Sequence, residues 1–162
     1  LANVLGLDMG MFYKRRDYTQ IVNGRNPIVA HEFLGSSVEG KDVIIIDDMI
    51  SSGDSIIEVA TEPKRRKAKR IFAAATFGLF TNGLDKFDQA YEDGTISGIL
   101  TTNLIYQTPE LLSRPYYINC DMSKYIALII DTLNHDGSIS SILSPDERIQ
   151  HVLQKYKNGE TI

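Results

Sequence analysis

Short runs of consecutive apolar residues recur along the chain, and their valine, isoleucine and aromatic residues predict β-strands. In the clearest run, four apolar residues, all of them β-branched, follow Asp42 without a break. Such a strand is typical of the middle of a parallel sheet, where both of its faces are buried. Strands are expected at residues 9–13, 42–46, 71–76, 98–102 and 116–119.

Other stretches have apolar residues three and four positions apart, which predicts amphipathic helices. The widest apolar stripe is formed by Met122, Ile126, Ile129, Ile130 and Leu133. We expect Asp121 to cap the helix that carries this stripe and Asp136-Gly137 to end it. Helices are expected at residues 1–5, 55–66, 85–92, 122–133 and 144–156.

Capping residues support the ends of these helices. Gly6 is expected to stop the first helix, and Pro63 is expected to bend or end the second. The sequence Ser144-Pro145-Asp146-Glu147 is a capping box, with serine at the cap, proline in the first turn and glutamate three residues on. This box predicts that the last helix begins there.

A hairpin interrupts the alternation of strands and helices. Residues 14–17 are polar and predict a break after the first strand. The strands 18–22 and 27–33 then flank Asn23-Gly24, a strong hairpin signal because both turn residues accept positive φ. The remaining strands alternate with helices, which predicts an α/β fold with a mainly parallel sheet and a β-hairpin insertion.

Composition restricts the functions that such a fold can serve. The chain has 162 residues, of which 43% are hydrophobic, and a net charge of −4. This charge argues against a general nucleic-acid-binding protein, and no apolar run is long enough to cross a membrane. A single cysteine, Cys120, indicates a reducing, cytoplasmic setting. The chain lacks an initiator methionine and opens like a helix already under way, so we expect it to be part of a longer protein.

The candidate chemistry lies where the strand 42–46 ends, because ligands of α/β sheets bind beyond the carboxyl ends of the strands. Two acids, Asp47 and Asp48, come first, and their carboxylates suit hydroxyl groups or a metal ion. A loop of small residues then enters a helix, where free backbone N–H groups and serine hydroxyls can bind a phosphate. This loop is Ser51-Ser52-Gly53-Asp54-Ser55. Together they predict a sugar-phosphate site, against the plainer alternative of an ordinary strand-to-helix turn.

The remaining polar features have simpler interpretations. The run 64–70 contains six basic residues and would suit nucleic acid, but a solvated helix end explains it better. His31, His135 and His151 lack the spacing of metal ligands, and Cys120 has no histidine partner nearby in the sequence.

Residues 43–55 resemble the signature that type I phosphoribosyltransferases share with ribose-phosphate pyrophosphokinases: an apolar strand, two acids and a small-residue loop. Other segments favour the pyrophosphokinases. Tyr13-Lys14-Arg15-Arg16 resembles the start of their catalytic loop. Further resemblance is carried by Val38-Glu39-Gly40-Lys41, Ala75-Thr76-Phe77-Gly78-Leu79-Phe80 and Thr101-Thr102-Asn103-Leu104-Ile105. The resemblance spans about residues 1–133.

The resemblance implies a type I phosphoribosyltransferase-like, Rossmann-like domain over residues 1–143, without its first strand, and a helical extension over 144–162. The family transfers the diphosphoryl group of ATP to ribose 5-phosphate, which gives phosphoribosyl pyrophosphate and AMP. Asp47 and Asp48 would hold the ribose hydroxyls, directly or through a Mg²⁺ ion bound to these acids. Ser51, Ser52, Gly53, Asp54 and Ser55 would surround the 5-phosphate. Lys14 and Arg16 would close over the transferred group, whose charge they would stabilise.

The resemblance also implies that this chain is the carboxy-terminal, ribose-phosphate-binding half of a homo-oligomeric enzyme. The family's adenine pocket lies largely in an amino-terminal half, so the chain alone is expected to lack pyrophosphokinase activity. No nucleic-acid or membrane partner is expected.

Several departures from the family pattern indicate a divergent subfamily. The family usually has Gly-Gly or Ala-Gly before its final threonine, whereas this chain has Gly53-Asp54-Ser55, and the Asp54 carboxylate would repel a phosphate. Phe77 stands where the family often has histidine. Two alternatives therefore stay open: a phosphoribosyltransferase, for which no base-recognition segment is found, and a regulator that binds phosphoribosyl pyrophosphate without turning it over.

Overall fold

The computed structural model describes residues 2–16, 28–144 and 146–160, and the side chains among them except those of 12–16, 28–32 and 141. The chain divides into two compact units. One, here called the sheet unit, is Gly10–Asp121, and the other, the helical unit, combines Leu1–Met9 with Met122–Ile162. The predicted domain boundary after residue 143 stays a prediction.

The sheet unit is built on four parallel strands in the order β3-β4-β5-β6. These strands are β3 (Asp42–Ile50), β4 (Arg70–Gly78), β5 (Gly98–Thr102) and β6 (Tyr117–Cys120). Helices connect them, namely α2 (Asp54–Arg65), α3 (Asp85–Glu92) and the short α4 (Pro109–Leu112). The predicted α/β fold with a mainly parallel sheet is confirmed.

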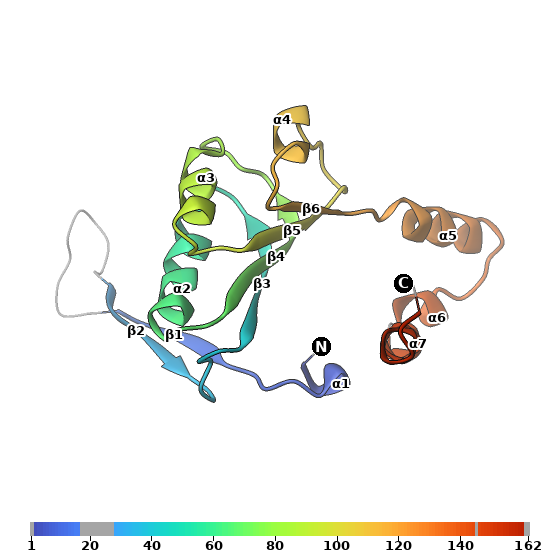
Figure 1. The fold of residues 1–162 in the computed structure, drawn as a ribbon. Helices are drawn as coiled ribbons and strands as arrows, with labels where there is room; N and C mark the ends of the chain where they lie inside the picture. The colour runs from blue at the N-terminus through green and yellow to red at the C-terminus, as the bar shows by residue number, and fades with distance from the viewer. Residues whose placement is uncertain (1, 17–27, 145, 161–162) are drawn as a thin grey trace. The chain divides into compact units, whose positions relative to one another are not determined.

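The core lies between the sheet and the helices α2 and α3, which cover the same face of the sheet (Figure 1). From the sheet, Ile71 and Ile99 are at most 2% exposed. From the helices, Ala60 of α2 and Phe87 of α3 are at most 1% exposed. Alternation along each strand sends every second side chain toward these helices, so a single apolar layer holds the unit together.

The strand β3 differs from its prediction in two ways. It is the edge strand of the described sheet, and Ile44 and Ile46 are 49% and 57% exposed. The expectation of a strand buried on both faces in the middle of the sheet was therefore wrong. In the described sheet unit, β3 has a strand neighbour on one side only, and the helices α2 and α3 cover the other face, away from these two residues.

The second strand of the predicted hairpin, 27–33, is confirmed as a strand, and its partner in the described residues is the strand before it. The strands β1 (Met11–Arg16) and β2 (Ile28–Leu34) are antiparallel, with Met11 opposite Leu34. Residues 14–16 belong to β1, so the polar break predicted at 14–17 was wrong for these three residues. Backbone groups form the hydrogen bonds of a strand pair, so a run of polar residues does not prevent pairing. The predicted strand 18–22 and its Asn23-Gly24 turn lie outside the described residues.

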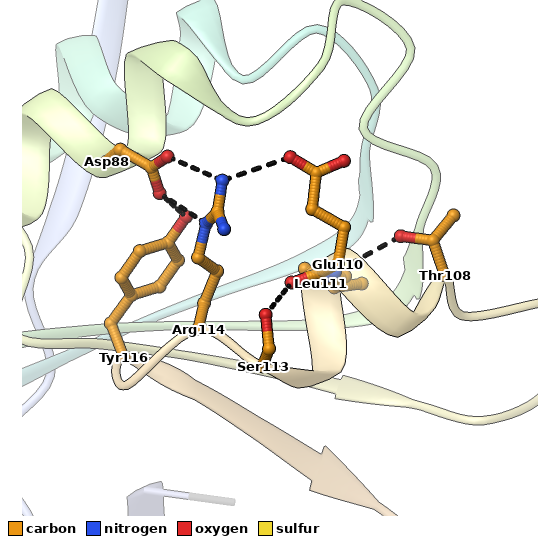
Figure 2. A network of polar contacts seen from close by, with 7 residues as sticks. All are labelled: Asp88, Thr108, Glu110, Leu111, Ser113, Arg114 and Tyr116. Carbon is orange, nitrogen blue, oxygen red and sulfur yellow. Dashed lines mark hydrogen bonds and ion pairs between the residues drawn. The ribbon is translucent and has the colours of Figure 1, made fainter.

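A polar network ties α3 to the connection between β5 and β6 (Figure 2). The Arg114 guanidinium lies between two carboxylates, bound to Asp88 by two hydrogen bonds of 2.9 Å and to Glu110 at 3.1 Å. The buried Tyr116 donates its hydroxyl to Asp88 at 2.6 Å. Burial raises the pKa of the Asp88 carboxyl, but hydrogen bonds from Tyr116 and Arg114 outweigh it and hold this pKa below its usual value. The network fixes the start of β6 against α3.

The helical unit contains α1 (Ala2–Leu5), α5 (Ser123–Asn134), α6 (Ser140–Leu143) and α7 (Asp146–Lys157). Gly6, at φ +65°, ends α1 as predicted, and Asp136 adopts a φ of +52° just beyond α5. The Gly137 N–H donates to the Thr132 carbonyl at 2.8 Å, which closes the end of α5 as predicted. Gln150 of α7 donates to the Val4 carbonyl at 3.2 Å and joins α7 to α1.

Two predictions about helix starts have different outcomes. The cap position of α5 is held by Met122, one residue after the predicted Asp121, and the Met122 side chain makes no capping bond. The Asp121 carboxylate accepts a hydrogen bond of 2.8 Å from the Asn103 side chain. The last helix begins at Asp146, as its capping box predicts, although Pro145 lies outside the described residues. Among the described helices, none has the length and apolar character needed to cross a bilayer.

Candidate functional site

The predicted acid pair lies at the carboxyl end of β3, but within the strand rather than after it. Asp47 is opposite Ala75 of β4, and the ladder continues through Met49 and Ile50. The prediction that the strand ends at residue 46 was wrong, because Ile50 pairs with β4 and is only 2% exposed. Both carboxylates are exposed, and the Asp47 carboxylate accepts a hydrogen bond of 2.9 Å from the Asp48 backbone N–H.

The predicted phosphate loop follows directly, with a bend over residues 51–53 and the start of α2 at Asp54. Gly53 occupies the cap position, and no side-chain hydrogen bond caps the helix there. The first N–H groups of a helix have no acceptor inside it and carry its positive dipole end. The loop therefore presents backbone donors within a few residues of the acid pair, and this is the local arrangement that anion binding requires.

Gly53 is required at the cap for two reasons. Its φ of +86° is a left-handed conformation that other residues adopt only at a cost. A Cβ at this position would lie 2.2 Å from Cζ of Phe87, which is 1% exposed and cannot yield. The shape of the loop thus depends on a buried ring that belongs to α3.

Asp54, the residue that departs from the family pattern, is paired within its own unit. Its carboxylate accepts a hydrogen bond of 3.0 Å from the Ser52 hydroxyl and another from the Lys86 ammonium group of α3. The Lys86 hydrogen bond, followed by the Ser52 hydrogen bond, holds the pKa of the Asp54 carboxyl below its usual value. The charge of Asp54 is therefore countered locally by a cation.

Sequence reasoning missed Thr81 and Lys86, which lie near this loop. The Thr81 N–H donates to the Ser51 carbonyl at 3.1 Å, and the hydroxyls of these two residues are 3.4 Å apart. Both missed residues follow β4, whose carboxyl end lies beside that of β3. Applying the rule about strand ends to β4 as well as to β3 would have pointed to Thr81.

The predicted catalytic residues Lys14 and Arg16 belong to β1. Their backbones lie opposite His31 and Ile28 of β2, and the register shifts between Arg15 and Arg16. Their side chains are not among those described, so their approach to the acid pair stays a prediction.

The basic residues of the run 64–70 are largely paired with acids of the sheet unit. Lys64 binds Asp93, Arg65 and Arg66 bind Glu62, and Lys67 and Arg70 bind Glu39 and Asp42. Most of these cations thus lie at or near the carboxyl end of α2, where they pair with acids and complement the helix dipole. The prediction that the chain does not bind nucleic acid stays a prediction.

The Glu62 pairs predict a measurable pH dependence. Hydrogen bonds from Arg65, and then from Arg66, lower the pKa of Glu62 from 4.5 to about 2. Because the folded pKa is the lower one, this stabilisation is complete above pH 4.5 and is lost as the pH falls toward about 2. We expect Glu62→Gln to remove about 1 kcal/mol of stability at neutral pH, since exposed helix pairs contribute a few tenths each.

Urea unfolding at several pH values between neutrality and acid would measure this effect. The gap between the wild-type chain and Glu62→Gln should close as the pH falls. Glu92→Gln, the same change at an exposed position of α3, is the matched control. An equal, pH-independent gap for both variants would contradict the prediction.

A hollow of about 800 Å³ lies between α2 and α3. Its lining includes Ile57, Ala90 and Thr95, and it reaches Asp54 and Lys86. The acid pair and residues 51–53 do not line it. The acid pair therefore lies at an open end of the sheet, and the hollow meets the candidate site at Asp54.

The acid pair suits a magnesium ion that takes some of its ligands from the protein and the others from a substrate and water. Within the described residues, no group of three or more His, Cys, Asp or Glu side chains gathers to hold a metal ion by themselves. Mg²⁺ usually takes one or two carboxylates, water and substrate oxygens, so Asp47 and Asp48 beside a phosphate loop provide a suitable donor set.

Comparisons with known proteins place these features in a family. The sequence profile described as "Phosphoribosyl synthetase-associated domain" matches residues 20–144. A ribose-phosphate pyrophosphokinase of Vibrio parahaemolyticus is 28% identical over 145 residues, which are 88% of this chain and 43% of that protein. One of Thermococcus kodakarensis is 32% identical over 115 residues, covering 69% of this chain and 39% of that protein. The chain thus spans about two fifths of the length of these relatives.

A solved structure supports the fold. The crystal structure of phosphoribosylpyrophosphate synthetase from Mycobacterium smegmatis matches with a TM-score of 0.57 and 23% identity, over 67% of this chain and 35% of that one. At this identity the likeness concerns the fold alone. The profile match covers well over half of the chain, so the chain belongs to the phosphoribosyl synthetase-associated domain family, and its resemblance to the ribose-phosphate pyrophosphokinases is confirmed.

Proposed function

We propose that this chain binds ribose 5-phosphate for the synthesis of phosphoribosyl pyrophosphate, as part of a longer pyrophosphokinase. In this reaction the 1-hydroxyl oxygen of the ribose attacks the β-phosphorus of ATP. The bond from that phosphorus to the oxygen bridging it to the α-phosphorus breaks, AMP leaves, and the hydroxyl proton passes to solvent.

The observation that carries the proposal is the short path from the acid pair to the helix cap. Asp48, near the end of β3, and Gly53, at the cap of α2, are separated by four residues, and only residues 51–53 lie between β3 and α2. Carboxylates accept hydrogen bonds from sugar hydroxyls, and a helix start binds phosphate. One ligand that has a diol and a phosphate at its two ends would satisfy both groups.

Each predicted residue has a role in this proposal. Asp47 and Asp48 hold the ribose hydroxyls and contribute to a Mg²⁺ site. The loop Ser51, Ser52, Gly53 and Ser55 surrounds the 5-phosphate, and Asp54 enters its first helical turn. Lys14 and Arg16 stabilise the charge of the diphosphoryl group during transfer, since phosphoryl transfer depends on positioned positive charge. Mg²⁺ supplies charge neutralisation on the phosphate oxygens of ATP.

Calorimetric titration of the 162-residue chain with ribose 5-phosphate in the presence of Mg²⁺ tests the binding step. We expect saturable binding of ribose 5-phosphate, and at least about tenfold weaker binding of ribose, which lacks the phosphate and about 1.4 kcal/mol or more of interaction. Ribose and ribose 5-phosphate binding equally, or neither binding, would overturn the proposal.

A second candidate is a regulator that binds phosphoribosyl pyrophosphate without turning it over. It is favoured by Asp54, whose carboxylate already accepts the hydrogen bond that the Ser52 hydroxyl could donate to a phosphate. Release of AMP from ATP and ribose 5-phosphate by the longer protein separates the two functions, since the regulator would release none. The chain by itself should release none in either case.

The wider setting is also part of the proposal. The longer protein works in the cytoplasm, which the single cysteine Cys120 supports, and it assembles as a homo-oligomer. Its nucleotide-binding residues lie in the part of the protein that this chain does not include.

A further inference from the structure

Both oxygens of the Asp54 carboxylate are engaged at the start of α2. The Ser52 hydroxyl donates to Oδ2 at 3.0 Å, and the Lys86 ammonium group donates to Oδ1. Asp54 itself is the first residue of the helix, so its charge also faces the positive end of the α2 dipole. The carboxylate thus interacts with a hydroxyl, a cation and a helix dipole, three kinds of group that also bind phosphate.

These contacts conflict with a phosphate bound in the same loop. A serine hydroxyl has one hydrogen to donate, so Ser52 cannot donate to Asp54 and to a phosphate at once. A carboxylate in the first turn also repels an incoming phosphate, because like charges a few ångströms apart interact unfavourably. The phosphate must therefore displace the Asp54 carboxylate from Ser52.

The pair is weak enough to be displaced. The side chains of Asp54 and Lys86 are 63% and 51% exposed. Exposed ion pairs contribute little to stability, since water competes for both partners. Lys86 carries a long flexible side chain, which allows its ammonium group to change partner without movement of α3.

We propose that Asp54 is an internal anion that competes with the 5-phosphate for Ser52 and Lys86, and so sets the affinity of the loop. When the phosphate binds, Ser52 and Lys86 exchange the carboxylate for it. Lys86 then becomes a phosphate ligand contributed by α3, in addition to the loop residues. This inference rests on the proposed function and assigns it an affinity-determining residue and a further binding residue.

Titration of the chain and its variants with two probes, ribose 5-phosphate and inorganic phosphate, tests the inference. Asp54→Asn should bind both probes about five times more tightly, the change expected when one like charge and one competing acceptor are removed. Asp54→Glu should bind like the wild type. Lys86→Met should bind both about five times more weakly, since the loop then loses a cation and keeps its acid.

Controls distinguish competition from a merely structural effect. Asp85→Asn makes the same charge change at the first residue of α3, next to Lys86, and should leave both affinities within about a factor of two. Thermal melting of each variant reports on folding separately. Raising the salt concentration should weaken phosphate binding to Asp54→Asn more than to Asp54→Asn with Lys86→Met, because the latter has lost the cation.

The outcomes separate this inference from the proposed function. Weaker or unchanged binding of both probes by Asp54→Asn would overturn the competition. Tighter binding of inorganic phosphate by Asp54→Asn, without any binding of ribose 5-phosphate, would support the competition and overturn the sugar-phosphate proposal. Failure of every variant to bind either probe would overturn both.

Discussion

Replacing Phe87 with alanine is expected to lower the free energy of unfolding of the sheet unit by about 4 kcal/mol. The ring is 1% exposed and belongs to the single apolar layer between the sheet and its helices. It packs edge-on against Phe80, with ring centroids 5.1 Å apart, and fills the space that a side chain at position 53 would need. Removing it leaves a cavity that the surrounding helices and strands cannot fill.

Urea unfolding followed by circular dichroism would measure this loss. The matched control is Tyr106→Ala, which also removes an aromatic ring but at a position that is 81% exposed. We expect the control to change stability by no more than about 0.5 kcal/mol. Similar losses for the two variants would contradict the placement of Phe87 at the centre of the core.

Phe87 also links the core to the candidate site. Because its ring occupies the space beside Gly53, its removal should allow the loop 51–53 to relax. We therefore expect the folded fraction of the Phe87→Ala variant to bind ribose 5-phosphate more weakly than the wild type. Phe87→Leu, which keeps most of the volume, should lose less stability.

Replacing both Asp47 and Asp48 with asparagine is expected to weaken the binding of ribose 5-phosphate by about 100-fold or more. Asparagine keeps the size of the side chain but removes the charge that strengthens hydrogen bonds from the ribose hydroxyls and binds Mg²⁺. Two weakened charge-assisted hydrogen bonds together account for a change of this size. Calorimetric titration with Mg²⁺ present would measure it.

The control for this variant lies on the same strand. Asp42→Asn removes one carboxylate at the opposite end of β3, where Asp42 pairs with Arg70, and should leave the affinity unchanged. The double variant should retain its melting temperature, because both acids are exposed and lie outside the core. Undiminished binding by the double variant would place the sugar elsewhere on the chain.

The elements with the strongest local patterns were predicted correctly. The helix 85–92 and the strand 98–102 have the predicted bounds, as α3 and β5. In both cases apolar spacing and the flanking turns act within a few residues, so the neighbours in the sequence suffice. The end of α1 at Gly6 is equally local, since it depends on the left-handed φ that glycine accepts.

The errors arose where contacts with distant residues decide the structure. The strand β3 runs on to Ile50 because β4 offers it backbone partners as far as Gly78. The polar residues 14–16 form a strand because β2 pairs with them. In each case a partner that is remote in the sequence overrode the local pattern.

The acid pair and the small-residue loop adjoin in any fold, because residues 47–55 are continuous in the chain. The fold class also followed from local patterns. In contrast, the pairing of Lys86 with Asp54, 32 residues earlier, and the packing of Phe87 beside Gly53 depend on how the chain folds. The physical reason is that α2 and α3 pack on the same face of the sheet, which brings the first turn of each helix to the same end.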